Sequence, residues 1–171
     1  RRTMRSDCVR PPPCCGPRRT SSSPTAGQAD VAKTADVVLT FVERVLPATG
    51  NVVLTPQTSG SAVTIAITDT TQVTFVNSVV TVNPAADLIP SQTGQNYVVS
   101  VGSGVITDAA TVRNDFVGVL YTFGVADTVA PTVTTYSPAQ GAADVALTSN
   151  IVLTFIEDMA VGSGTVVLTP A

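Results

Sequence analysis

Apolar and polar residues alternate in short runs along most of the chain, and turn-forming residues separate the runs. Side chains point to opposite faces at successive positions of a β-strand, so this alternation predicts strands that bury one face and expose the other. Short strands in regular succession are typical of an antiparallel β-sandwich. The runs lie at residues 36–42, 50–55, 61–68, 71–76, 78–83, 96–101 and 117–123.

The same alternation gives the expected core. In four of the runs, every second residue is apolar, and we expect these residues to face inward. Val and Thr are abundant and favour strands, whereas long runs of helix-forming residues are missing, so the fold class is expected to be all-β. The inward residues are Val37, Leu39 and Phe41; Val63, Ile65 and Ile67; Tyr97, Val99 and Val101; and Val119, Tyr121 and Phe123.

The chain contains an internal repeat. Residues 23–56 return as residues 137–170 at an offset of 114 without gaps, and 19 of the 34 positions are identical. The inward set of the first run returns as Ile151, Leu153 and Phe155. A period of this length corresponds to a whole domain rather than to one unit of a solenoid, so we expect tandem sandwiches.

The two copies differ at their beginnings. APTVTTYSP (130–138) precedes the second copy and has a strand pattern, whereas GPRRTSSSP (16–24) does not. We therefore expect the first repeat to lack its first strand, or the chain before Ser23 to be foreign to the repeat. The second copy stops at Ala171, before a sandwich is complete. A partial sandwich cannot bury its inner face, so we interpret the chain as a fragment of a longer array.

These observations divide the chain into four parts. Residues 1–22 form a basic leader, rich in Pro and Cys, that we expect to be disordered. Residues 23–124 form the first repeat, 125–131 a linker made semi-stiff by Pro131, and 132–171 the N-terminal part of the second repeat. Three interpretations of the leader stay open: a tail that binds anionic surfaces, a metal site, or a segment foreign to the repeat. The metal site would use Cys8, Cys14 and Cys15.

Several segments resemble bacterial immunoglobulin-like repeats of the SbsA type, named after an S-layer protein. They are DTVAPTVTTYSPAQGAADVALTSNIVLTFIEDM (127–159), GNVVLTP (50–56), VTVNPAADL (80–88) and NYVVSVGSGVITDAA (96–110). The resemblance implies immunoglobulin-like sandwiches of about seven strands in surface or secreted proteins, without catalytic residues. This chain has Asp108-Ala109-Ala110-Thr111-Val112-Arg113-Asn114 where the family usually has a tight Gly turn, so we expect a longer or looser loop there.

The charges are divided unevenly. Residues 1–20 carry six Arg and one Asp, which gives +5, and residues 21–171 carry three basic and eleven acidic residues, which gives −8. An acidic body disfavours nucleic acid as a partner because phosphates are bound by Lys and Arg. The leader has no apolar stretch of the kind a secretory signal needs, and no segment is apolar for long enough to span a membrane.

Few residues of the sequence are candidates for catalysis or metal binding. The chain has no His, which removes the usual catalytic triads and imidazole metal sites. Asp69-Thr70-Thr71, Gly102-Ser103-Gly104 and Gly162-Ser163-Gly164 are interpreted as turns. Glu43 and Glu157 occupy equivalent repeat positions, which favours a structural role such as a strand-end hydrogen bond.

Calcium is the one cofactor with a candidate site. Calcium takes oxygen ligands, and Asp127 in the linker could lie near Asp108; the alternative is solvated surface charge. No catalytic, cofactor-binding or metal-binding residue is assigned.

We expect a non-enzymatic spacer in an extracellular or cell-surface protein, S-layer or adhesin-like, with neighbouring repeats as its partners. The alternative is an adhesive module whose loops at one end of the sandwich bind a surface glycan or a protein.

Overall fold

The computed structural model describes residues 16–90 and 94–169. The chain divides into two compact units, of which the first ends at Asp127 and the second begins at Thr128. Each unit is described separately below. The interpretation of Cys8, Cys14 and Cys15 lies outside the described residues.

The first unit contains ten β-strands. All seven predicted runs form strands, which confirms the all-β prediction. The strands are β1 Arg19–Ser23, β2 Val37–Phe41, β3 Val45–Pro47, β4 Asn51–Pro56, β5 Val63–Ala66, β6 Val73–Val76, β7 Val79–Val82, β8 Gln95–Val101, β9 Ile106–Asp108 and β10 Val119–Val125.

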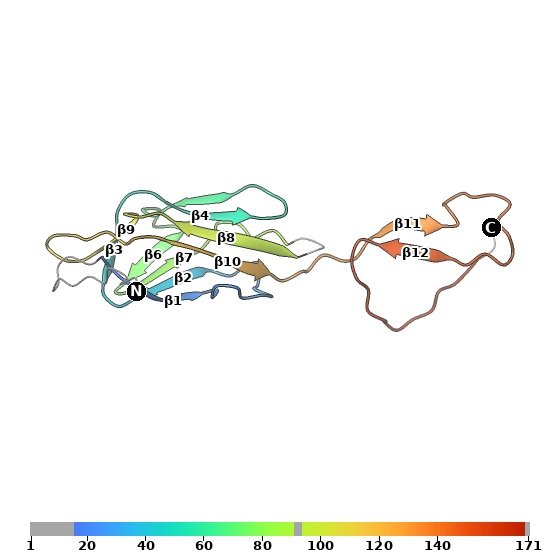
Figure 1. The fold of residues 1–171 in the computed structure, drawn as a ribbon, viewed down its shortest axis with the longest axis horizontal. Helices are drawn as coiled ribbons and strands as arrows, with labels where there is room; N and C mark the ends of the chain where they lie inside the picture. Colours follow the sequence, from blue (N-terminus) through green and yellow to red (C-terminus); the bar gives the residue numbers. More distant parts are fainter. Residues whose placement is uncertain (1–15, 91–93, 170–171) are drawn as a thin grey trace, which may run out of the picture. The chain divides into compact units, whose positions relative to one another are not determined.

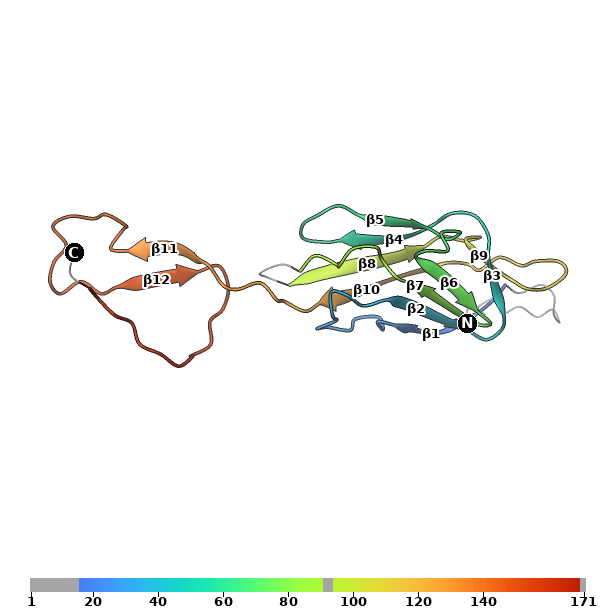
Figure 2. The same cartoon turned by 180° about the vertical axis from the view of Figure 1, so that it is seen from behind.

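Eight of these strands form two stacked antiparallel sheets, as Figures 1 and 2 show from opposite sides. One sheet has the order β1-β2-β7-β6 and the other the order β10-β8-β4-β5. These orders correspond to the two sheets of immunoglobulin-like sandwiches, with β5 added at one edge. The fold is therefore an immunoglobulin-like β-sandwich.

The space between the sheets is filled by the predicted inward residues. Val37, Leu39 and Phe41 of β2 are between 0% and 3% exposed, and of the sets predicted within the first unit only Val63 and Val119 are half-buried. Phe41 meets Phe116 edge to face, with ring centroids 5.2 Å apart. Apolar burial is the main force that holds such a sandwich together, and no cysteine is available within residues 16–171 to reinforce it.

Two short strands were not predicted. β3 and β9 have three residues each and pair antiparallel with one another, so that Val45 lies opposite Asp108. Three residues are too few to show an alternation, and these strands exist because each supplies the other's backbone partners. They lie together at one end of the sandwich, near the start of β10 (Figure 1).

The prediction that the first repeat lacks its first strand was wrong. β1 pairs with β2 across residues 19–23, so the leader that we expected to be disordered up to residue 22 is ordered at least from Gly16. The strand had no apolar alternation because only one of its side chains, that of Ser22, is buried. Backbone pairing with β2, rather than an apolar face, forms this edge strand.

The second unit repeats the first two strands of the first unit. β11 (Val133–Ser137) pairs with β12 (Val152–Phe155), and every register pair equals a β1–β2 pair shifted by 114. Both ladders have the same irregularity, at Arg19/Ser21 and at Val133/Thr135.

The inner face of the second unit has no covering sheet among residues 128–169. Ile151 and Leu153 are 53% and 43% exposed, whereas the equivalent Val37 and Leu39 are fully buried. The same sequence pattern is thus core in one unit and open surface in the other.

Candidate functional site

The loop after β9 is organised by one buried carboxylate, that of Asp108. Its Oδ1 accepts hydrogen bonds from the backbone N–H of Asn114 at 2.9 Å and of Ala110 at 3.3 Å, and its Oδ2 accepts one from the Asn114 side chain at 2.7 Å. This tie replaces the missing Gly turn, so the loosening that we expected does not occur at these residues. Burial is the largest single influence and raises the pKa of Asp108, but the hydrogen bonds from Asn114 and Ala110 and the charge of Arg113 together outweigh it and leave the pKa below its ordinary value.

The proposed calcium ligands do not meet. Asp108 bonds to Asn114 ahead of β10, whereas Asp127 follows the end of β10. The seven residues of β10 extend over roughly 20 Å, which is far beyond the reach of one ion's ligand shell. Within residues 16–90 and 94–169, no group of three or more His, Cys, Asp or Glu side chains could hold a metal ion.

Asp69-Thr70-Thr71 is a turn between β5 and β6. Asp69 Oδ1 accepts hydrogen bonds from the backbone N–H and the hydroxyl of Thr71, at 2.9 and 2.6 Å. Asp69 Oδ2 accepts a further bond from the Gln72 side chain at 2.8 Å, and these bonds, led by that from the Thr71 hydroxyl, lower the pKa of Asp69. The aspartate therefore closes its own turn.

The two remaining glycine motifs and Glu43 are surface features. Gly102-Ser103-Gly104 forms the turn from β8 to β9, and Gly162-Ser163-Gly164 lies outside the strands of the second unit. Glu43 is exposed in the bend after β2. Glu157, its equivalent in the second unit, is half-buried, and the strand-end hydrogen bond expected of the two glutamates stays a prediction.

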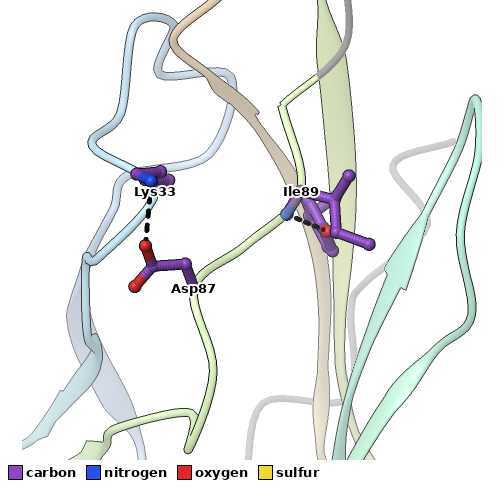
Figure 3. Close-up of polar contacts among 4 residues, drawn as sticks. Lys33, Asp87 and Ile89 are labelled. Carbon is purple, nitrogen blue, oxygen red and sulfur yellow. Dashed lines mark hydrogen bonds and ion pairs between the residues drawn. The ribbon is translucent and has the colours of Figure 1, made fainter. Parts of the chain in front are cut away.

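A small depression lies where β2 begins and β7 ends, away from the Asp108 loop. It is lined by residues 33–35 and 83–87, and Lys33 forms an ion pair of 3.0 Å with Asp87 across it. Figure 3 shows this pair beside Ile89, whose backbone N–H donates to the Tyr97 hydroxyl at 2.9 Å. Both polar contacts fasten the segment before β8 to the sandwich.

A larger groove, of about 830 Å³, lies between residues 16–19 and 113–119. We call it the arginine groove because Arg18, Arg19 and Arg113 line it; Asp115 is the acidic residue on its wall. The Arg19 guanidinium lies 5.5 Å from the ring centroid of Tyr121, a cation–π contact. Tyr121 is buried beneath it, and burial raises the pKa of its hydroxyl.

Comparison with protein families decides the classification. The sequence model of a family described as "Bacterial Ig-like domain" matches residues 16–124 and 127–170. The chain belongs to the bacterial Ig-like domain family.

Among solved structures, CopC from Methylosinus trichosporium OB3b is similar at 19% identity and a TM-score of 0.47, over 67% of this chain and 97% of CopC. No curated protein matches the chain.

The Tyr97–Ile89 bond gives the bacterial Ig-like domain a feature known from other immunoglobulin-like sandwiches. Tyr97 lies near the start of β8 and bonds back to the backbone eight residues upstream. This is the arrangement called a tyrosine corner, in which a phenol fixes the connection that enters the strand. The Tyr97 ring also stacks on Phe123, with centroids 6.1 Å apart.

Sequence reasoning missed the arginine groove. Arg18 and Arg19 were assigned to the leader, and Arg113 stands alone in a loop, so nothing in their spacing brought them together. A signal was nevertheless present, since Pro17 matches Pro131 and Thr20 matches Thr134 at the repeat offset of 114. Extending the repeat comparison back to residue 16 would have placed both arginines on the sandwich.

The described part of the bacterial Ig-like chain contains no apolar helix long enough to span a bilayer.

Proposed function

We propose that this chain is a non-catalytic spacer from an array of tandem immunoglobulin-like repeats in an extracellular or cell-surface protein. One observation carries the proposal: the pairing of β1 with β2 recurs in β11 and β12 residue for residue, including its irregularity. Loop conformations recur as well, with Asp30 at φ 54° and Asp144 at φ 55°. A chain that repeats a domain-sized unit in this detail is suited to setting a length rather than to one local reaction.

The first unit is connected in a way that suits it to bearing load. Residues 27–31 run parallel to β10 along its edge, with Val31 opposite Val125. Four backbone bonds join them: Gly27 N–H to Thr122 O, Gly124 N–H to Gln28 O, Val31 N–H to Gly124 O and Ala126 N–H to Val31 O. The chain enters the unit before β1 and leaves it after β10, so tension pulls these two parallel segments in opposite directions. All four bonds then bear the load together.

Single-molecule stretching of the whole chain between two marker domains tests the spacer proposal. We expect one discrete unfolding event whose length gain corresponds to roughly 100 residues, or about 350 Å. Val31→Pro removes the bond that Val31 donates to Gly124, so it is expected to lower the unfolding force. Extension of the wild-type chain without a discrete event would overturn the proposal.

The location is a part of the proposal that needs its own test. Intact cells that make the full-length protein are treated with a protease that cannot enter them. Digestion of the repeat on intact cells is expected, and protection until the cells are opened would contradict an extracellular location.

A second candidate function, adhesive binding by loops at one end of the sandwich, is favoured by one observation, the arginine groove. The groove joins the start of β1 to the loop before β10, which is an end of the sandwich. A glycan or a protein could occupy such a groove.

A further inference from the structure

We infer that the arginine groove binds an extended, acidic segment of a partner protein, which continues the pairing along the open part of the β10 edge. This inference goes beyond the spacer proposal and deepens the binding alternative named above. It rests on the charge of the groove, on the comparison with the second repeat and on the backbone edge beside it.

Positive charge is concentrated in the groove. Residues 16–127 hold five basic residues and eight acidic ones, a net charge of −3, yet three of the five basic residues and only one acidic residue line the groove. Of the remaining two, Lys33 is paired with Asp87. Among the described residues, neither Arg18 nor Arg113 forms an ion pair, although the charge of Arg113 is close enough to Asp108 to lower the pKa of that carboxyl. An acidic partner would therefore find the cationic part of an otherwise acidic surface.

The pairing of β1 with β2 does not need these charges. Thr132 and Val133 stand in the second repeat where Arg18 and Arg19 stand in the first. The backbone is nevertheless the same, because Arg18 O accepts from Val42 N–H at 3.0 Å and Thr132 O accepts from Ile156 N–H at 3.1 Å. Of these two repeats, the first has arginine at both positions. Arg19 also lies over the Tyr121 ring, whereas Arg18 is exposed and its charge serves no contact of the strand pairing, as expected of a binding feature.

The β10 edge beside the groove is open. Residues 27–31 cover its second half by bonding to Thr122, Gly124 and Ala126. Successive residues of a strand direct their backbone groups to opposite sides, so the N–H and C=O of Leu120 face this same edge. No described residue bonds to Leu120 there, and the Leu120 side chain is 72% exposed.

Exposed apolar side chains and a free backbone edge favour a peptide over a sugar polymer. Val117 lines the groove and is 85% exposed, and Leu120 follows three residues later, directly after the last lining residue, Val119. An extended peptide could place alternate side chains against Val117 and against the arginines while its backbone bonds to Leu120, which is the mode called β-augmentation. A polyanionic glycan could satisfy the arginines but has no backbone amides in strand register.

The test uses the whole chain and a short fluorescent peptide of alternating Val and Glu, with affinity read from anisotropy near physiological salt. Arg18→Thr combined with Arg113→Gln is expected to weaken binding about tenfold, because two charge-assisted contacts are lost. Lys33→Gln combined with Arg44→Gln removes the same net charge outside the groove and is expected to leave the affinity within about twofold, since salt screens distant charges. Asp115→Asn is expected to strengthen binding.

Amide hydrogen exchange distinguishes backbone pairing from simple attraction between charges. The Leu120 amide is expected to exchange more slowly when the Val/Glu peptide is bound, and a Val/Lys peptide is expected to bind and protect nothing. The inference would be overturned if the two double variants weakened peptide binding equally. It would also be overturned if a sulfated polysaccharide displaced the peptide completely and the bound peptide did not protect the Leu120 amide. The groove variant is expected to keep the wild-type unfolding force, so failure here leaves the spacer proposal standing.

Discussion

The hydroxyl of Thr20 donates a hydrogen bond of 3.0 Å to the backbone carbonyl of Thr40. Thr20 is the residue skipped by the β1–β2 register, so its side chain supplies a donor where the backbone ladder is interrupted. Thr134 makes the same 3.0 Å bond to Thr154 in the second unit. The register shift between the two strands, with its threonine hydrogen bond, is therefore a reproducible part of the repeat.

Thr20→Val keeps the shape of the side chain and removes this donor. The bond is exposed, and water can replace part of it, so we expect a loss of about 0.5–1 kcal/mol in the free energy of unfolding of the first unit. Urea titration followed by far-ultraviolet circular dichroism measures the loss. Thr20→Ser keeps the hydroxyl and is expected to stay closer to wild type; a larger loss for Ser than for Val would contradict this account.

Leu39 and Leu153 provide a matched pair in nearly identical sequence. Leu39 is fully buried, whereas Leu153 is 43% exposed, so Leu39→Ala should leave a cavity and Leu153→Ala should not. We expect a loss of about 2–5 kcal/mol for Leu39→Ala and no change in first-unit unfolding for Leu153→Ala. Tyr97 and Tyr121 are buried in the first unit, whereas Tyr136 is 51% exposed in the second, so the change in tyrosine fluorescence on unfolding reports mainly on the first unit. A loss of first-unit stability for Leu153→Ala as large as that for Leu39→Ala would contradict this account, because an exposed side chain of the second unit cannot hold the first unit together.

The sequence predicted the strands of the core but little of the surface chemistry, for a physical reason. Val37, Leu39 and Phe41 show an alternation because each buries a side chain against the opposite sheet. β1 shows no such alternation, because backbone hydrogen bonds to β2 hold it in place rather than a row of buried side chains. The arginine groove joins residues about 95 positions apart in the chain, and only the three-dimensional arrangement of β1 and β10 brings Arg18 and Arg113 to one groove.

Asp108 should make the first unit sensitive to acid. Its pKa in the folded state lies below the ordinary Asp value, so its stabilising effect is fully present above about pH 4 and is lost as the pH falls through the folded-state pKa. Asp69 acts in the same direction. We expect Asp108→Asn to cost about 1–3 kcal/mol near neutral pH, because an amide cannot accept all three bonds. Urea titrations at neutral and acidic pH measure both effects.

Asn114→Ala is the companion variant, because it removes the side-chain donor and keeps the carboxylate. It should raise the folded-state pKa of Asp108 and make the acid-induced loss of stability smaller than in wild type. Asp108→Asn should also reduce this loss. If both variants kept the full wild-type pH dependence, the carboxylate would not act as described.

Gly118, at the rim of the arginine groove, has a backbone that few other residues can adopt. Its φ is +92°, and a Cβ there would lie 2.6 Å from the carbonyl oxygen of Val101. Gly27 also has a positive φ, of +77°, but a Cβ there would meet nothing within 4 Å. We expect Gly27→Ala to cost about 1 kcal/mol from backbone strain alone and Gly118→Ala to cost clearly more. Thermal unfolding of the two variants compares them, and equal costs would mean that the β8–β10 end rearranges freely.

Tyr97→Phe isolates the hydroxyl of the tyrosine corner. The ring can keep its stacking on Phe123, while the N–H of Ile89 loses its acceptor. We expect a loss of about 1–2 kcal/mol, because a half-buried donor is left without a partner. Hydrogen exchange at Ile89 should become faster, whereas exchange at Val99 in the middle of β8 should change only as much as the global stability does. Lys33→Gln removes the neighbouring ion pair with Asp87, which is about half exposed, and should cost no more than about 1 kcal/mol. If Lys33→Gln released Ile89 as strongly as Tyr97→Phe does, the ion pair rather than the phenol would hold this segment to the sandwich.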